Sequence, residues 1–192
     1  MAAALKSLHL FKGTFTGYGE GFDLEAAPTR LQALIMFIRV LGEEEQALTW
    51  SGTTPFKDIE KGSQAEHYVG YAYEKGYTNG YTATSFKPAG AVNAYQYTEF
   101  VLRAMGYSSA ANKDLSDTLL RAVNAGVLTD GDAAMLQSAA FLRAQLVYIS
   151  YYALEADLPD GSQSLADRLM DLGVFTRDEW LGSWKLVKSD RL

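Results

Sequence analysis

The chain has 192 residues, of which 48% are hydrophobic and 21% are charged, and its formal net charge is −6. It is long enough for one substantial core, or for a few small repeats that share one, and its composition is that of a globular protein rather than a disordered one. The acidic net charge argues against nucleic acid as a partner, and the lack of an apolar run of about 20 residues argues against a membrane span. The absence of cysteine excludes disulfides, a thiolate nucleophile and a cysteine-based zinc site.

The first residues, Met1 to Lys6, lack the basic segment and the long apolar stretch of a secretory signal peptide. They open directly into a predicted helix. We therefore expect that the native start of the protein, with any export signal, lies upstream of Met1.

One short pattern occurs four times along the chain: the end of a helix, a glycine or its substitute, and then a pair of apolar residues. Glycine suits the place after the last helical turn because it adopts a left-handed conformation without a steric penalty. In the first copy His9 takes this place, and histidine tolerates a positive φ better than most side chains. A second glycine in each of the first three copies would allow a tight turn. The glycines predicted to make these turns are Gly13, Gly76, Gly80, Gly126 and Gly131.

A second helix is predicted after each of the first three copies. Apolar residues recur at helical spacing from Leu31 to Leu41, from Tyr97 to Met105 and from Leu142 to Ala153. One-sided stripes of this kind pack against other helices, and a single helix pair cannot bury its apolar face alone. We therefore expect three helix pairs that pack together. Between the first two pairs, the run 43–45 of three glutamates is typical of the solvated face of a linker.

The tail after Gly161 repeats only the first helix and its cap, and we expect Trp180 and Trp184 to pack over the end of the bundle. The predicted organisation is a first repeat (1–42), a linker (43–54), a second repeat (55–106), a divergent third repeat (107–155) and a helical C-terminal extension (156–192).

The segment from Pro55 to Gly106 resembles a full S-layer homology (SLH) repeat. The resemblance rests on Pro55-Phe56-Lys57-Asp58-Ile59, on the run 68–81, on Ser85-Phe86-Lys87-Pro88 and on the helical run 94–106, and it extends more weakly over residues 1–155. It implies a mainly α fold of three helix–loop–helix repeats, packed as a pseudo-threefold helical bundle. It also implies non-covalent anchoring of a bacterial surface protein to cell-wall polysaccharide, and hence an extracellular place on the cell wall.

SLH repeats carry a signature near the start of the second helix, usually Ile-Thr-Arg-Ala-Glu. The matching segments here are 28–32, 92–96 and 141–145. Their chemistry also makes sense by itself, because Thr29 and Asn93 are good N-caps and a glutamine three positions later can complete a capping box. A guanidinium at a helix start, beside free backbone amides, makes a site for an anion.

In the family this arginine contributes to grooves between repeats that hold an acidic sugar, typically one with a pyruvate ketal. The resemblance carries this role to Arg30 and Arg143. The aspartate of the Phe-x-Asp start helps to shape the groove, which suggests Asp58 and, as a weaker match, Asp117. The predicted polysaccharide-binding set is Arg30, Gln32, Asp58, Tyr68, Asp117, Arg143 and Gln145.

The departures from the signature are informative. Its acidic position is glutamine in all three copies, Ala94 replaces the arginine in the second, and Leu142 replaces the capping threonine in the third. We therefore expect one or two competent grooves rather than three, with the groove of Arg30 first and that of Arg143 second.

Two alternatives stay open. An eroded signature also fits a degenerate SLH module that serves as a protein-interaction or surface-layer lattice scaffold, with other copies of the surface-layer protein as partners and no glycan binding. For Arg30 itself, the simpler interpretation is an exposed helix-start residue with a salt bridge and no ligand.

Neither catalysis nor a cofactor is expected. No motif places two carboxylates across a cleft, and there is no serine nucleophile elbow or phosphate loop. No metal is expected either, because His9 and His67 lack partners at metal-ligand spacing and Asp130-Gly131-Asp132 lacks the rest of a calcium-loop pattern.

Overall fold

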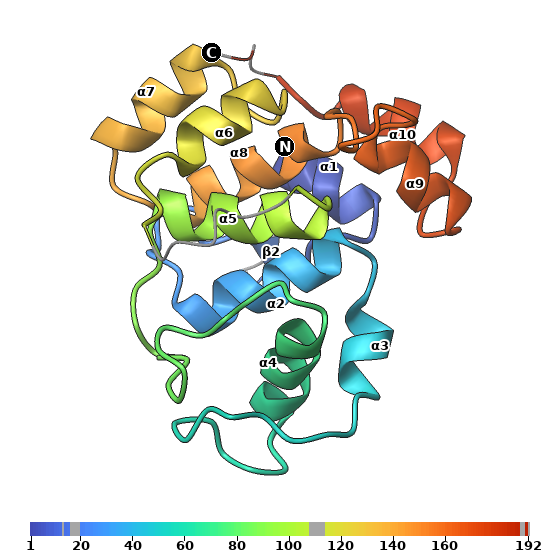
Figure 1. The fold of residues 1–192 in the computed structure, drawn as a ribbon. Coiled ribbons are helices and arrows are strands. Elements are labelled where there is room, and N and C mark those ends of the chain that lie inside the picture. The colour runs from blue at the N-terminus through green and yellow to red at the C-terminus, as the bar shows by residue number, and fades with distance from the viewer. Residues whose placement is uncertain (13, 16–19, 108–113, 189–190, 192) are drawn as a thin grey trace.

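The computed structural model covers residues 1–192 and describes all of them except 13, 16–19, 108–113, 189–190 and 192. The described part contains ten helices and one two-stranded antiparallel hairpin (Figure 1), which confirms the mainly α fold. The helices are α1 (Ala2–Ser7), α2 (Arg30–Val40), α3 (Glu44–Leu48), α4 (Gln64–Glu74), α5 (Ala94–Ala104), α6 (Thr118–Asn124), α7 (Asp130–Ser138), α8 (Arg143–Ala153), α9 (Leu165–Asp171) and α10 (Arg177–Trp184), and the strands are β1 (Thr14–Phe15) and β2 (Glu20–Gly21).

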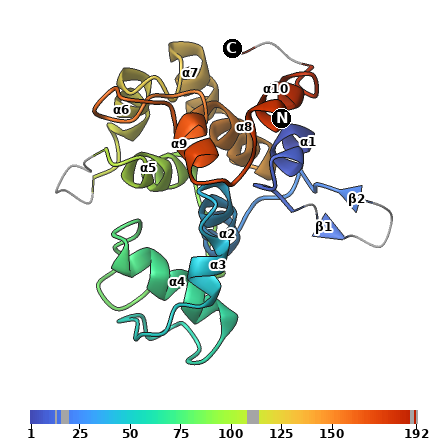
Figure 2. The same cartoon turned by 90° about the vertical axis from the view of Figure 1, so that its right-hand side faces the viewer.

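Helices α2, α5 and α8 form the centre of the molecule. Each has 11 residues, each contacts the other two, and both views place them side by side (Figures 1 and 2). They are the three second helices predicted from the sequence, and their stripes face the core. The buried stripe residues include Leu34, Ile38, Phe100, Val101, Leu146 and Ile149. The division of the chain into three repeats remains a prediction.

Loops from elsewhere in the chain cap two of these central helices. The first two N–H groups of α2 donate to the carbonyls of Gly90 (2.8 Å) and Pro88 (3.1 Å), in the loop before α5. The first two N–H groups of α8 donate in the same way to Ala26 (2.9 Å) and Leu24 (3.0 Å), in the loop before α2. A helix start leaves such groups without an intrahelical partner, so these bonds both satisfy them and tie the helices together.

The predicted glycine turns are confirmed at three positions. Gly76, Gly80 and Gly126 have φ values of 74°, 79° and 72°, and His9 has a φ of 63° in the equivalent place of the first copy. The prediction for Gly131 is wrong, because this residue lies in the first turn of α7. Thr129 caps that helix through a reciprocal bond with Asp132, which also removes the resemblance to a calcium loop. Gly13 lies outside the described residues.

The run of glutamates after α2 is not the solvated linker face expected from the sequence. Helix α3 packs against α2 and α4, and its start brings two carboxylates to buried tyrosines. Glu43 accepts hydrogen bonds from the hydroxyls of Tyr71 (3.0 Å) and Tyr77 (2.9 Å), and Glu44 accepts one from Tyr68 (2.7 Å). The carboxylates are needed there because a buried hydroxyl without a partner costs free energy.

The C-terminal tail holds two helices, α9 and α10, rather than the single helix expected. Helix α10 packs against α1, so the first and the last helix of the described residues lie side by side (Figure 2). Trp180 is buried as expected, whereas Trp184 is 51% exposed and makes an edge-to-face contact with the Trp180 ring at 5.9 Å between centroids.

Candidate functional site

The first turn of α2 is fixed by its own side chains. The Thr29 hydroxyl accepts a hydrogen bond from the Gln32 N–H (3.2 Å), and the Gln32 Oε1 accepts one from the Thr29 N–H (3.0 Å). This is the capping box predicted from the sequence. It sets Arg30 as the first helical residue and holds its side chain against the loop before α5.

The guanidinium of Arg30 is buried without a counterion. The residue is 5% exposed, its Nε has no hydrogen-bond partner, and no carboxylate of the described residues forms an ion pair with it. Its Cζ lies 4.9 Å from the ring centroid of Phe86 and 5.2 Å from that of Phe100. Burial, and then the positive charge of Arg103, lower the pKa of Arg30 to about 10. The interpretation of Arg30 as an exposed, salt-bridged residue is therefore wrong.

Asp58 holds the loop that lies against Arg30. Its carboxylate accepts hydrogen bonds from the N–H groups of Phe86 and Lys87, both at 2.8 Å, and from the Ser85 hydroxyl at 2.7 Å. Desolvation opposes ionisation, but these three donors outweigh it and lower the pKa of Asp58. Asp58 thus sets the position of the Phe86 ring, and through that ring the surroundings of Arg30.

The start of α8 presents Arg143 in a different environment. Its Gln145 Oε1 accepts a hydrogen bond from the Leu142 N–H (2.9 Å), but the leucine side chain has no acceptor to complete the box. Arg143 is only half-buried. Burial lowers the pKa of Arg143 and the negative charge of Asp23 opposes this shift, so Arg143 has an acidic neighbour. The start of α5 has a complete capping box, from Asn93 and Gln96, but holds the buried Ala94 instead of a cation.

Two other predicted residues are occupied by internal contacts. Tyr68 is 2% exposed and donates its hydroxyl to Glu44, so it offers almost no surface to a ligand. Asp117 accepts a hydrogen bond from the Nε of Arg121 (3.2 Å), four residues along α6, and does not hold a loop as Asp58 does.

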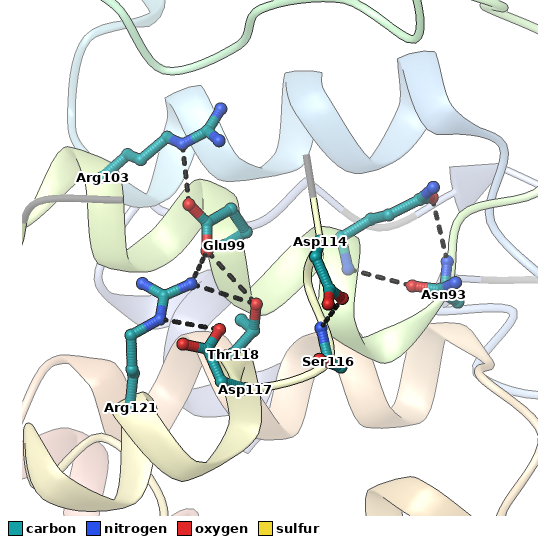
Figure 3. Close-up of polar contacts among 9 residues, drawn as sticks. Asn93, Glu99, Arg103, Asp114, Ser116, Asp117, Thr118 and Arg121 are labelled. Carbon is teal, nitrogen blue, oxygen red and sulfur yellow. Dashed lines mark hydrogen bonds and ion pairs between the residues drawn. The ribbon is translucent and has the colours of Figure 1, made fainter. Parts of the chain in front are cut away.

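Asp117 belongs to a cluster of charges around Glu99, which sequence reasoning missed (Figure 3). Glu99 is 2% exposed and accepts hydrogen bonds from Arg103 Nε (2.9 Å), Thr118 Oγ1 (3.3 Å) and the guanidinium of Arg121. The signal in the sequence was a carboxylate next to Phe100, on the buried face of a predicted helix. Arg103 is paired with Glu99 in this cluster, so it is not a second buried cation without a carboxylate partner.

Two cavities have linings that do not include Arg30, Asp58 or Arg143, although the first borders the Glu99 cluster at Arg121. One of about 210 Å³ is lined by Leu102, Tyr107, Arg121, Asn124 and Ala125, and one of about 340 Å³ lies along α9 and the start of α10. Within the described ranges, no three acidic or histidine side chains come together as a metal site would require, and no helix has the length and apolar character of a bilayer span.

Residues 55–93 match the family model of the S-layer homology domain. The matched segment includes Asp58, Phe86 and the loop that caps α2. The chain is also 24% identical, over an alignment of 230 positions including gaps, to a protein of Thermoanaerobacter kivui described as a cell surface protein. That alignment takes in 99% of this chain but only 30% of the relative, so the chain spans less than a third of the relative's length.

Proposed function

We propose that this chain anchors a bacterial surface protein non-covalently to the cell wall, by binding an acidic, pyruvylated wall polysaccharide at Arg30. The observation that carries the proposal is the buried guanidinium of Arg30, which forms no ion pair with any carboxylate of the described residues. A charge in such a place costs free energy unless an anion pairs with it. A sugar carboxylate supplies that anion, and two parallel hydrogen bonds from a guanidinium suit its shape.

Other features of the site agree with a carboxylate ligand. Gln32 uses its Oε1 in the capping box, which leaves its amide N–H groups as donors at the same helix start. The positive end of the α2 dipole also favours an anion there. The protein and an anionic wall polymer repel each other at long range because the net charge is −6, so affinity must come from such local contacts.

The comparisons support the place and the class of function. SLH domains generally serve to attach proteins to cell walls, and the T. kivui relative is named as a cell surface protein. Both favour a non-enzymatic module at the cell surface. Asp58, with its hold on Phe86, is proposed to shape the site rather than to touch the sugar.

The three helix starts differ in ways that rank them. Arg30 is buried and has no ion pair within the described part of the chain, Arg143 is half-buried beside Asp23, and Ala94 brings no cation. We propose one strong site at Arg30 and a weaker one at Arg143, where Gln145 lies next to the arginine.

Calorimetric titration with pyruvylated wall-polysaccharide fragments tests the proposal. R30A is expected to weaken binding about 100-fold, because a charge-assisted pair is lost from a buried site. R143A is expected to keep the strong site. R177A is the matched control, since Arg177 also begins a helix with a complete capping box but is exposed. If wild-type protein with an intact fold does not bind the fragments, wall anchoring through this site is refuted.

A second candidate function, a scaffold that associates with other copies of the chain, is favoured by the surface of α10. Helices α7 and α10 both begin after a capping threonine, Thr129 and Thr176, so their positions can be compared from there. The exposed positions five and eight residues after the cap hold Leu181 and Trp184 in α10 but the smaller or polar Ala134 and Gln137 in α7. Two large apolar side chains on one helix face are typical of a contact surface. If this is correct, sedimentation velocity should show association that increases with protein concentration and that W184S abolishes. L120S is the control, because Leu120 is an exposed apolar residue on another helix. A strictly monomeric domain that binds the glycan would exclude the scaffold.

A further inference from the structure

A lysine and a tyrosine stand together beside the Arg30 site. The Nζ of Lys87 lies 3.6 Å from the ring centroid of Tyr81, and Tyr81 is 50% exposed. Lys87 directly follows Phe86, whose ring stacks on Arg30. Burial and Arg103 lower the pKa of Arg30, and the phenol of Tyr81 opposes that shift, which agrees with a position close to Arg30.

The loop that carries this pair is rigidly held. The N–H groups of Tyr81 and Thr82 both donate to the Ser85 carbonyl, at 2.8 and 3.0 Å, which folds the loop back on itself. Gly80 enters the loop at a φ of 79°, where a Cβ would lie 2.3 Å from the Phe56 ring. At the other end Lys87 has a φ of 58° and donates its N–H to Asp58. The backbone therefore brings Tyr81 and Lys87 together whether or not their side chains attract each other.

We propose that Tyr81 and Lys87 form the sugar-facing part of the Arg30 site and select an acidic pyranose over a neutral one. The ring of Tyr81 serves as a platform for the apolar face of the sugar, and Lys87 is a second cation that leaves the ring to bind the ligand's carboxylate. This inference rests on the proposed function. Lys87 gains when it exchanges the Tyr81 ring for the ligand's carboxylate, because a cation–π contact at an exposed ring is weaker than a charge-assisted hydrogen bond.

The proposal explains two features that folding alone does not. Lys87 is an exposed lysine in a left-handed conformation, which most side chains avoid. Tyr81 is a large aromatic residue with half of its surface in solvent, although neighbouring Phe56 and Phe86 are buried. Both features are expected where a loop is shaped to present side chains to a ligand.

The test is calorimetric titration with three probes: a methyl hexoside that bears a pyruvate ketal, the same hexoside without the ketal, and pyruvate alone. K87M is expected to weaken binding of the ketal hexoside about tenfold, whereas K87R keeps most of the affinity. Y81A is expected to weaken the ketal hexoside about tenfold and to leave pyruvate unchanged, because the platform contacts only the sugar. K75M is the matched control, since Lys75 lies over the Tyr71 ring at 5.5 Å in another part of the molecule.

Nuclear magnetic resonance gives a readout that does not depend on affinity. In the free protein, we expect the ring of Tyr81 to shift the Cε protons of Lys87 upfield, and Y81L to return them to their ordinary values. Saturation of the wild-type protein with the ketal hexoside should do the same. Lys87 protons that stay upfield at saturation would show that the lysine never leaves the ring, and would overturn the exchange.

The outcomes separate the two proposals. Suppose that wild-type protein binds the ketal hexoside, that R30A abolishes binding, and that both K87M and Y81A stay within about twofold of wild type. The role proposed for Tyr81 and Lys87 is then wrong, and wall anchoring stands. If wild-type protein does not bind the ketal hexoside at all, both proposals fail. Equal affinity for the hexoside with and without the ketal would overturn selection for an acidic sugar.

Discussion

Arg30 and Glu99 are two buried charges in opposite situations. Glu99 is 2% exposed and is surrounded by the donors of Arg103, Arg121 and Thr118. Arg30 is 5% exposed and has two aromatic rings beside it, and no carboxylate of the residues that the structure describes pairs with it. A buried charge is tolerated when it is paired and costly when it is not. The arginine therefore carries a cost that Glu99 does not, and a ligand is what would offset it.

Replacing Arg30 by methionine should make the protein more stable. Methionine has a long apolar side chain that fits between Phe86 and Phe100 without a charge to desolvate. We expect R30M to raise the free energy of unfolding by about 1 kcal/mol while abolishing glycan binding. Urea denaturation at neutral pH measures the change. E99Q is the contrasting variant, expected to lose about 3 kcal/mol because it removes the buried carboxylate that pairs with two partly buried arginines. A large loss of stability in R30M would mean that Arg30 is structural.

The carboxylate of Glu44 makes stability depend on pH. Desolvation raises its pKa, but hydrogen bonds from Lys12, Tyr68 and Arg39 outweigh this and lower it to about 2. The unfolded-state pKa is about 4.3, so the folded state holds its proton less tightly. The stabilisation, about 1 kcal/mol because solvent screens this partly exposed group, is thus fully present above pH 4.3 and is lost as the pH falls towards 2.

Urea denaturation of wild type and E44Q at several pH values tests this. E44Q should be less stable than wild type at pH 7, and the difference should shrink as the pH falls below about 4. E45Q is the control, because Glu45 is an exposed neighbour on α3. A difference between wild type and E44Q that stays constant down to pH 2 would contradict the prediction.

At the scale of elements, half of the ten described helices share one kind of start, and α8 has only part of it. Helices α2, α5, α7, α9 and α10 each begin with a threonine, asparagine or serine cap and a reciprocal partner three residues later. Helix α8 has the reciprocal partner, Gln145, but Leu142 stands in the cap position. Its extended backbone, with φ of −108° and ψ of 173°, is already that of an N-cap residue.

Introducing a cap at α8 should therefore stabilise the protein. In L142T the new hydroxyl can accept a hydrogen bond from the Gln145 N–H, and we expect the free energy of unfolding to rise by about 0.5–1 kcal/mol. T29A, which removes the cap of α2, should lower it by about 1 kcal/mol. Thermal and urea denaturation measure both. A fall in stability for L142T would show that the apolar contacts of Leu142 matter more than the missing cap.

What the sequence predicted at this scale was local. Caps, positive φ after helices and apolar stripes depend on residues within a few positions of one another, so they could be inferred without the fold. The capping box of Thr129 and Asp132 was equally local, and recognising it would have placed α7 correctly. The sequence also indicated Arg30, but not its two flanking rings, because Phe86 and Phe100 lie more than fifty residues along the chain. The tyrosine contacts of Glu43 and Glu44 were missed for the same reason.

At the scale of the whole molecule, the C-terminal hairpin α9–α10 repeats the geometry of α6–α7. Gly126 and Gly173 have φ values of 72° and 73°, and in both hairpins an apolar pair and a capping threonine follow the glycine. The second hairpin closes the molecule. Helix α10 packs on α1, and the ring of Trp180 lies 6.2 Å from that of Tyr151 in α8. Residues 156–192 are thus in contact with both the first and the third predicted repeat.

The hairpin should therefore unfold together with the rest of the chain. W50F leaves tryptophan only in α10, so its fluorescence reports the hairpin, while far-ultraviolet circular dichroism reports all helices. We expect the two signals to give the same urea midpoint and slope, because removing α10 would expose the core residues of α1 and the Tyr151 ring and cost more than the hairpin could recover alone. Comparison within one variant avoids any effect of W50F on overall stability. A fluorescence transition at lower urea would show instead that α9–α10 is a separate unit that opens first, and the contacts with α1 would then be too weak to hold the first and the last helix of the described residues together.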